Sequence, residues 1–155
     1  MSHRPPKLLC STAPFFARPL REALRHISEA GYEGVEVMVT RDPATQEPHL
    51  LSDLAGEFGL RVEAIHAPFL LITRKVWGTE PVGKIYRAIE LAEDVGAPLV
   101  VIHPPYRWQA KYRRWLQERV SELSAHTGVT VAMEDRKSTR LNSSHIQKSR
   151  MPSSA

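Results

Sequence analysis

Two histidines and a glutamate occur at equivalent places along the chain. His66, His103 and Glu134 each lie six or seven residues after a glycine, at the end of a short apolar run. Imidazole nitrogens and carboxylate oxygens are ligands that Zn²⁺, Mn²⁺ and related divalent ions take in proteins. A lone histidine in such a place is usually a hydrogen-bonded structural residue, but two at matching positions together with a carboxylate favour a functional site. We therefore predict that these three residues bind a divalent metal ion (Mn²⁺, Zn²⁺, Mg²⁺ or Co²⁺).

The residues between these positions predict how the three side chains are brought together. Five short runs rich in β-branched residues indicate strands that are buried on both faces; they cover residues 7–13, 34–39, 61–67, 98–103 and 129–134. Amphipathic helical patterns lie between the runs, and each ends at a glycine, which tolerates the left-handed backbone that terminates helices. These glycines are Gly31, Gly59, Gly96 and Gly128. The alternation predicts a parallel sheet with right-handed crossovers, in which chemistry is placed at the carboxyl ends of the strands.

Each helical pattern also predicts an apolar face that packs on the sheet. The four expected faces are Leu20, Ala23, Leu24 and Ile27; Leu50, Leu51, Leu54, Ala55 and Phe58; Ile85, Ala88, Ile89, Ala92 and Val95; and Tyr112, Trp115, Leu116, Val120 and Leu123. Two α/β architectures fit five such units: a (β/α)₈ barrel cut after its fifth strand, and a complete doubly wound sheet. The turn after the first strand has no glycine-rich phosphate loop, and the fifth unit is interrupted. We therefore predict an α/β fold that forms part of a (β/α)₈ TIM barrel, with strands 1–5 of 8.

Other charged residues near the strand ends have two open interpretations each. Glu36 lies within a buried strand, where a carboxylate needs a partner, so it is either a substrate ligand or half of a structural ion pair. Arg74 and Lys75 follow the third strand and either bind a phosphate or carboxylate of the substrate or are exposed loop charges. Residues 104–115 mix aromatic and basic side chains, which suits either a nucleic-acid surface or an ordinary amphipathic helix.

Composition separates the last 21 residues from the rest. The 155-residue chain has a net charge of +4, but five of its 21 basic and only one of its 17 acidic residues lie in 135–155, which leaves 16 of each in residues 1–134. The polar stretch 135–155 resembles the translation of a sequencing adapter, so we expect it to be non-native and disordered and to take no part in the fold. The natural residue at position 134 is then either Glu or Asp.

The neutral remainder favours a small-molecule partner over nucleic acid, because it carries no net positive field. A single cysteine, Cys10, fits a reducing compartment. No run approaches the length of a membrane helix or of a secretory signal. We accordingly expect a cytoplasmic protein that does not contact membranes, whose oligomeric state the sequence leaves open.

Four motifs together resemble a known family. The segments GYEGVEVMV, VEAIHAPF, APLVVIHPP and VTVAME, spread from Lys7 to Glu134, are similar to the xylose isomerase-like TIM-barrel superfamily and especially to its bacterial sugar phosphate isomerase/epimerase proteins. In that branch the resemblance implies that Glu134 binds a divalent metal and takes part in proton transfer at the sugar carbon next to the carbonyl, while His66 and His103 line the substrate pocket. In the related endonuclease IV branch, it implies that His66, His103 and Glu134 bind zinc.

The resemblance also implies what the isolated chain can do. The intact parent is expected to be a sugar or sugar phosphate isomerase or epimerase, with a zinc phosphodiesterase acting on abasic DNA as the alternative. A chain of five units lacks the remaining metal ligands and leaves strand edges unpaired. We therefore expect the 155-residue chain itself to be inactive.

Overall fold

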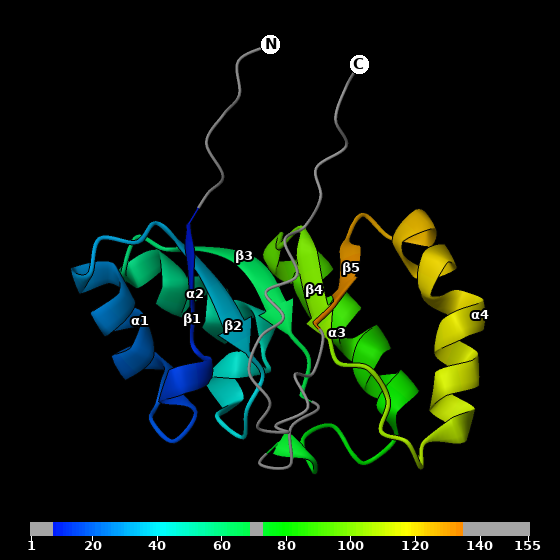
Figure 1. Cartoon of the computed structure of the whole chain (residues 1–155). Coiled ribbons are helices and arrows are strands. Elements are labelled where there is room, and N and C mark those ends of the chain that lie inside the picture. The colour runs from blue at the N-terminus through cyan, green and yellow to red at the C-terminus, as the bar shows by residue number, and fades with distance from the viewer. Residues whose placement is uncertain (1–7, 69–72, 135–155) are drawn as a thin grey trace, which may run out of the picture.

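The computed structural model of the chain describes residues 8–68 and 73–134, in which five strands form one parallel sheet. The strands are β1 (Leu9–Ser11), β2 (Gly34–Met38), β3 (Arg61–His66), β4 (Leu99–Ile102) and β5 (Thr130–Met133). They pair in chain order, β1-β2-β3-β4-β5, so each strand lies beside the one that follows it in the sequence (Figure 1). The predicted run of five parallel strands is thus confirmed, and residues 135–155 lie outside the described part of the chain.

Helices connect the strands and cover one face of the sheet (Figure 1). The long helices are α1 (Leu20–Glu29), α2 (Pro48–Glu57), α3 (Pro81–Val95) and α4 (Ala110–His126), and the short 3₁₀ turns are η1 (Ala13–Phe15) and η2 (Pro43–Thr45). No helix in the described ranges is both long and apolar enough to cross a membrane.

The core lies between this helical layer and the sheet. Alternate residues of a strand point to opposite faces, and the alternate positions Val35, Val37, Ile65, Val100 and Ile102 are all fully buried. The predicted face of α1 is buried throughout. Burial of these apolar side chains supplies the main stabilisation of the sheet–helix layer.

Two local expectations need correction. Leu50 is 40% exposed rather than buried, because Leu51 and Leu54 take the inward side of α2 and their neighbour falls about 100° away around the helix. Gly31, Gly59 and Gly96 have positive φ at helix ends, as predicted, but Gly128 does not. α4 instead ends at Thr127, whose backbone is extended, so the chain enters β5 without a left-handed residue.

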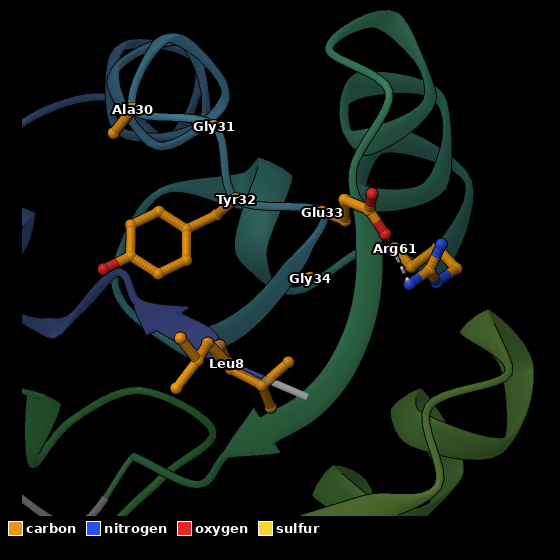
Figure 2. Close-up of a pocket in the computed structure, with 8 residues that line it drawn as sticks. Leu8, Ala30, Gly31, Tyr32, Glu33, Gly34 and Arg61 are labelled. Carbon is orange, nitrogen blue, oxygen red and sulfur yellow. Dashed lines mark ion pairs between the residues drawn. The ribbon is translucent and has the colours of Figure 1, made fainter. Parts of the chain in front are cut away.

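A hollow of about 480 Å³ opens at the amino ends of β1 and β2 (Figure 2). Leu8 and Tyr32 line it together with Glu33 and Arg61, whose charged groups lie 3.5 Å apart. Residues at this end of parallel α/β folds serve stability rather than chemistry. Functional residues are therefore expected at the opposite, carboxyl ends of the strands.

Candidate metal centre

A register shift in the sheet places Glu36 and His66 on the same face. Val35 pairs with Val62, but Glu36 pairs with Ala64, so Glu63 is skipped as a bulge. Without the bulge, Glu36 would stand opposite Glu63, three residues from His66, and the glutamate and the histidine would point to opposite faces. With it, Glu36 and His66 share the face turned away from the helices, and a bulge next to a site is a common way to re-aim a side chain.

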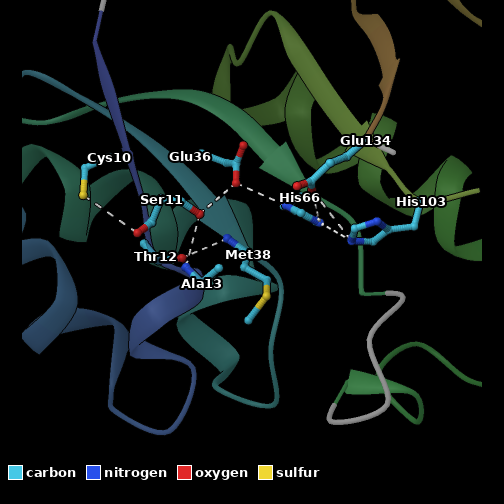
Figure 3. A network of polar contacts seen from close by, with 9 residues as sticks. All are labelled: Cys10, Ser11, Thr12, Ala13, Glu36, Met38, His66, His103 and Glu134. Carbon is cyan, nitrogen blue, oxygen red and sulfur yellow. Dashed lines mark hydrogen bonds and ion pairs between the residues drawn. The ribbon is translucent and has the colours of Figure 1, made fainter. Parts of the chain in front are cut away.

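His103 and Glu134 reach the same face from the next two strands. His66 pairs with Val101, and Val101 pairs with Ala132. His103 and Glu134 lie two residues beyond these partners, so alternation directs both side chains to the side that carries His66. Figure 3 shows the three side chains converging at the carboxyl ends of β3, β4 and β5.

The three converging groups have the spacing of a metal centre. His66 Nε2 lies 3.0 Å from His103 Nε2 and 3.8 Å from Glu134 Oε2, and His103 Nε2 lies 3.9 Å from the same oxygen. The point equidistant from three atoms with these separations is about 2.1 Å from each, and Zn–N and Zn–O bonds measure about 2.0–2.2 Å. Both imidazoles are buried, whereas the Glu134 side chain is 55% exposed, so an ion would be held from the protein side and reached from solvent. The residues therefore fit a divalent cation.

A hydrogen-bond chain fixes the orientation of His66. Ser11 Oγ donates to Glu36 Oε1 at 2.8 Å, and the same oxygen lies 3.1 Å from His66 Nδ1 (Figure 3). The hydrogen bond from His66 lowers the pKa of the Glu36 carboxyl, aided by Ser11 and opposed by burial. An ionised carboxylate only accepts hydrogen bonds, so His66 Nδ1 carries the proton and Nε2 presents its lone pair to the centre. Carboxylate–histidine pairs of this kind orient metal ligands and fix their tautomer.

The hydrogen bond between the two imidazoles determines which nitrogen of His103 carries a proton. Because His66 Nε2 accepts, His103 Nε2 donates the hydrogen bond that joins the two rings. That proton occupies the space between the nitrogens into which a cation would fit. Cation binding must displace it, since a ligating imidazole nitrogen is unprotonated.

The structure thus brings together all four residues that the sequence singles out. His66, His103 and Glu134 offer ligand atoms that lie within 4.8 Å of one another. Glu36 accepts a hydrogen bond from His66 Nδ1 and does not reach the convergence point itself, so its partly buried carboxylate has the partner that such a group needs. Sequence reasoning missed Ser11, which lies inside the first apolar run and is singled out only by its structural position, at the end of β1 and paired with Glu36 in the sheet.

Comparison with known sequences extends this description. The family profile described as "Xylose isomerase-like TIM barrel" matches residues 24–143. An uncharacterized protein of Mycobacterium leprae (strain TN) is 37% identical over 129 residues, covering 83% of this chain and 46% of the relative. An uncharacterized protein of Mycobacterium bovis is 36% identical over the same length and the same shares. The chain therefore spans about half the length of the curated relatives it matches.

Solved structures show the same architecture. A putative uncharacterized protein from Parabacteroides distasonis superposes with a TM-score of 0.61 at 14% identity, covering 84% of this chain and 53% of that one. An AP endonuclease, family 2, from Brucella melitensis gives 0.56 at 15%, covering 83% and 55%. The apo form of 3-keto-D-glucoside 4-epimerase from E. coli gives 0.54 at 17%, covering 83% and 56%. The five-stranded sheet is accordingly part of a TIM barrel. These structural similarities establish the fold and say nothing about the function of the chain.

Proposed function

Because this chain belongs to the xylose isomerase-like TIM barrel family, we propose that the whole protein is a sugar isomerase or epimerase that uses a divalent metal ion and a carboxylate for proton transfer. The observation that carries the proposal is the convergence of His66 Nε2, His103 Nε2 and Glu134 Oε2 at separations of 3.0–3.9 Å. A sugar epimerase among the structural neighbours is in keeping with it.

The proposed metal ligands are His66, His103 and Glu134. A divalent ion held by them would supply Lewis acidity, stabilising negative charge on the carbonyl oxygen of an open-chain sugar. Glu134 is the proposed catalytic residue, because its half-exposed carboxylate can both reach a ligand from solvent and exchange a proton at the carbon next to that carbonyl. A second proton-transfer group is expected from the part of the protein that this chain does not include.

The buried residues of the centre have positioning and binding roles in this proposal. Glu36 holds the Nδ1 proton of His66 and so keeps the opposite nitrogen aimed at the centre. The two imidazoles form one wall of the site, where they would contact the hydroxyl groups of the substrate. Glu36 would act on the substrate through His66, or would contact it directly at the edge of the wall that the two imidazoles form.

The test is hydrogen exchange at carbon. The full-length parent, supplied with Mn²⁺ in D₂O, is expected to incorporate deuterium at the carbon next to the carbonyl of an aldose or ketose, as followed by NMR. Glu134→Gln is expected to abolish the exchange, since an amide cannot take the proton. Glu33→Gln, which changes a carboxylate at the opposite end of the sheet, is the matched control and retains exchange. Exchange at an equal rate in both variants would contradict the role of Glu134.

A second candidate is a zinc phosphodiesterase acting on abasic DNA. It is favoured by the two-histidine, one-glutamate donor set, which is the set that the endonuclease IV branch uses, and by an AP endonuclease among the structural neighbours. The even balance of 16 basic and 16 acidic residues in 1–134 weighs against a DNA-binding field. Nicking of an abasic duplex by the full-length parent, without any carbon–hydrogen exchange, would select this candidate instead.

A further inference from the structure

A second cavity is lined by residues of the chain segments that follow β3 and β4, beyond the carboxyl ends of these strands. Its volume is about 360 Å³, and its walls include Arg74, Lys84, Tyr106 and Trp108. Two of these residues, Arg74 and Tyr106, follow the two histidines by eight and three positions in the sequence. Lys84 Nζ donates to the carbonyl of Pro68, two residues after His66, at 2.9 Å.

The walls of this cavity carry positive charge without a counter-charge. None of its lining residues is acidic. The described parts of the two loops, residues 73–80 and 103–109, include three basic residues and one acidic residue, Glu80, whose carboxylate accepts hydrogen bonds from the first backbone N–H groups of α3. A local excess of positive charge favours the binding of an anion.

The two basic side chains that line the cavity, Lys84 and Arg74, have different surroundings. Lys84 is 4% exposed, and within the part of the chain that the structure describes its ammonium donates to backbone carbonyls, among them Arg74 O at 2.8 Å. Burial lowers the pKa of this ammonium. The Arg74 side chain is exposed and forms no ion pair with any residue in the described ranges. Its guanidinium offers the planar pair of donors that a phosphate or carboxylate accepts.

An aromatic surface stands beside these cations. The rings of Tyr106 and Trp108 are stacked with centroids 4.5 Å apart and planes 6° apart, and Trp108 is 77% exposed. Stacking on Tyr106 holds the indole in place while its other face stays open to solvent. An open indole face packs well against the C–H groups on one side of a sugar ring, which is a rigid and largely apolar contact.

We infer that this cavity binds the anionic end of the substrate, so that the natural substrate is a sugar that bears a phosphate or carboxylate remote from its reacting carbons. Arg74 pairs with the anion, and Trp108 stacks on the carbon skeleton next to it. The inference rests on the proposed function, because the metal centre is assigned the other end of the same molecule. The anion site would give the protein a higher affinity for charged than for neutral sugars, a preference that the metal centre alone does not provide.

The experiment compares three hexoses that differ at one position: glucose 6-phosphate, glucuronate and glucose. Their affinities for the 155-residue chain are measured by isothermal titration calorimetry in EDTA, with circular dichroism as the folding check. Glucose 6-phosphate or glucuronate is expected to bind and glucose to bind at least tenfold more weakly, the effect of one charge-assisted hydrogen bond. Which of the two anions binds more tightly assigns the phosphate or the carboxylate.

Matched variants locate the binding. Arg74→Gln is expected to weaken binding of the anionic sugar about ten- to a hundredfold. Lys75→Gln removes the same charge from the next residue, which is exposed and does not line the cavity, and is expected to change the affinity by less than about twofold. Trp108→Leu is expected to weaken binding of the charged and the neutral sugar by the same factor, about two- to tenfold.

Four outcomes would overturn the inference: equal binding of glucose and the charged sugars, equal effects of the two loop substitutions, inorganic phosphate bound as tightly as glucose 6-phosphate, or a short single-stranded DNA bound more tightly than any sugar. Since EDTA removes divalent ions, a negative result here contradicts the anion site. A negative result in the deuterium-exchange assay contradicts the proposed function, so the two failures are distinguishable.

Discussion

Replacing Glu36 by Gln tests whether the centre depends on the group behind its first histidine. The substitution keeps the size of the side chain and removes its charge. The carboxylate accepts hydrogen bonds from Ser11 Oγ and from His66 Nδ1, at 2.8 and 3.1 Å. An amide can present its nitrogen to the imidazole instead, which would favour the tautomer with a proton on Nε2. That tautomer cannot bind a cation through Nε2, the nitrogen that faces the centre.

The expected change in Zn²⁺ affinity follows from the charged hydrogen-bond acceptor that the substitution removes from His66. A hydrogen bond to a charged group contributes about 1.5–3 kcal/mol, and removal of an outer carboxylate from a ligating histidine costs about 10- to 100-fold in metal affinity. Part of the Glu36 side chain is exposed, 23%, so solvent screens the interaction. We therefore expect the dissociation constant of Zn²⁺ to rise about tenfold, near the lower end of this range.

The assay is a Zn²⁺ titration of the 155-residue chain by calorimetry with a competing chelator. Glu33→Gln is the matched control, because Glu33 is a charged neighbour of β2 at the other end of the sheet, paired with Arg61. His66→Ala sets the scale for the loss of one ligand. Equal Zn²⁺ affinities for Glu36→Gln and Glu33→Gln, with a large loss in His66→Ala, would refute the positioning role of Glu36.

Three further predictions concern stability. Asp42→Ala is expected to lower the free energy of unfolding in urea by about 1–2 kcal/mol, because one carboxylate oxygen accepts from Leu20 N at 2.7 Å and the other from Ala44 N at 3.0 Å, capping α1 and η2; an unchanged urea midpoint would contradict this. Lys84→Met is expected to lower it by about 1–3 kcal/mol, since backbone carbonyls of the loop after β3 lose their buried donor, and protease cleavage confined to that loop provides a second readout. The pKa of Glu36 is lowered from 4.5 in the folded state, so its carboxylate adds stability above that pH and loses it as the pH falls through the folded value. The difference in unfolding free energy between wild type and Glu36→Gln should shrink below about pH 4.5, and a pH-independent difference would count against the hydrogen bond from His66 to the Glu36 carboxylate.

Much of the architecture was predictable because it depends on local patterns. Runs of β-branched residues and helical spacing fixed the order of five strands and four helices, and glycines marked three of the four helix ends. The exceptions have physical causes. Leu50 is apolar but lies beside the buried side of α2, and Gly128 follows a helix that ends at an extended threonine instead.

The sequence predicted which residues of the candidate site come together, but only partly how they contact one another. The carboxyl ends of neighbouring parallel strands meet at one edge, so His66, His103 and Glu134 could be grouped from their places in the repeat. The contact between Glu36 and His66 could not be foreseen, because it depends on the bulge that skips Glu63 and changes which residues share a face. The cavity beside Arg74 likewise depends on how two loops pack, for which the sequence has no periodic signal.

Anomalous diffraction from crystals of the full-length parent soaked in Zn²⁺ and measured at the zinc edge tests the central claim most directly. We predict a peak about 2.0–2.3 Å from Nε2 of His66, from Nε2 of His103 and from the carboxylate of residue 134. A zinc peak elsewhere, or imidazoles that keep their mutual hydrogen bond with no peak between them, would contradict the assignment of these three residues as a metal centre.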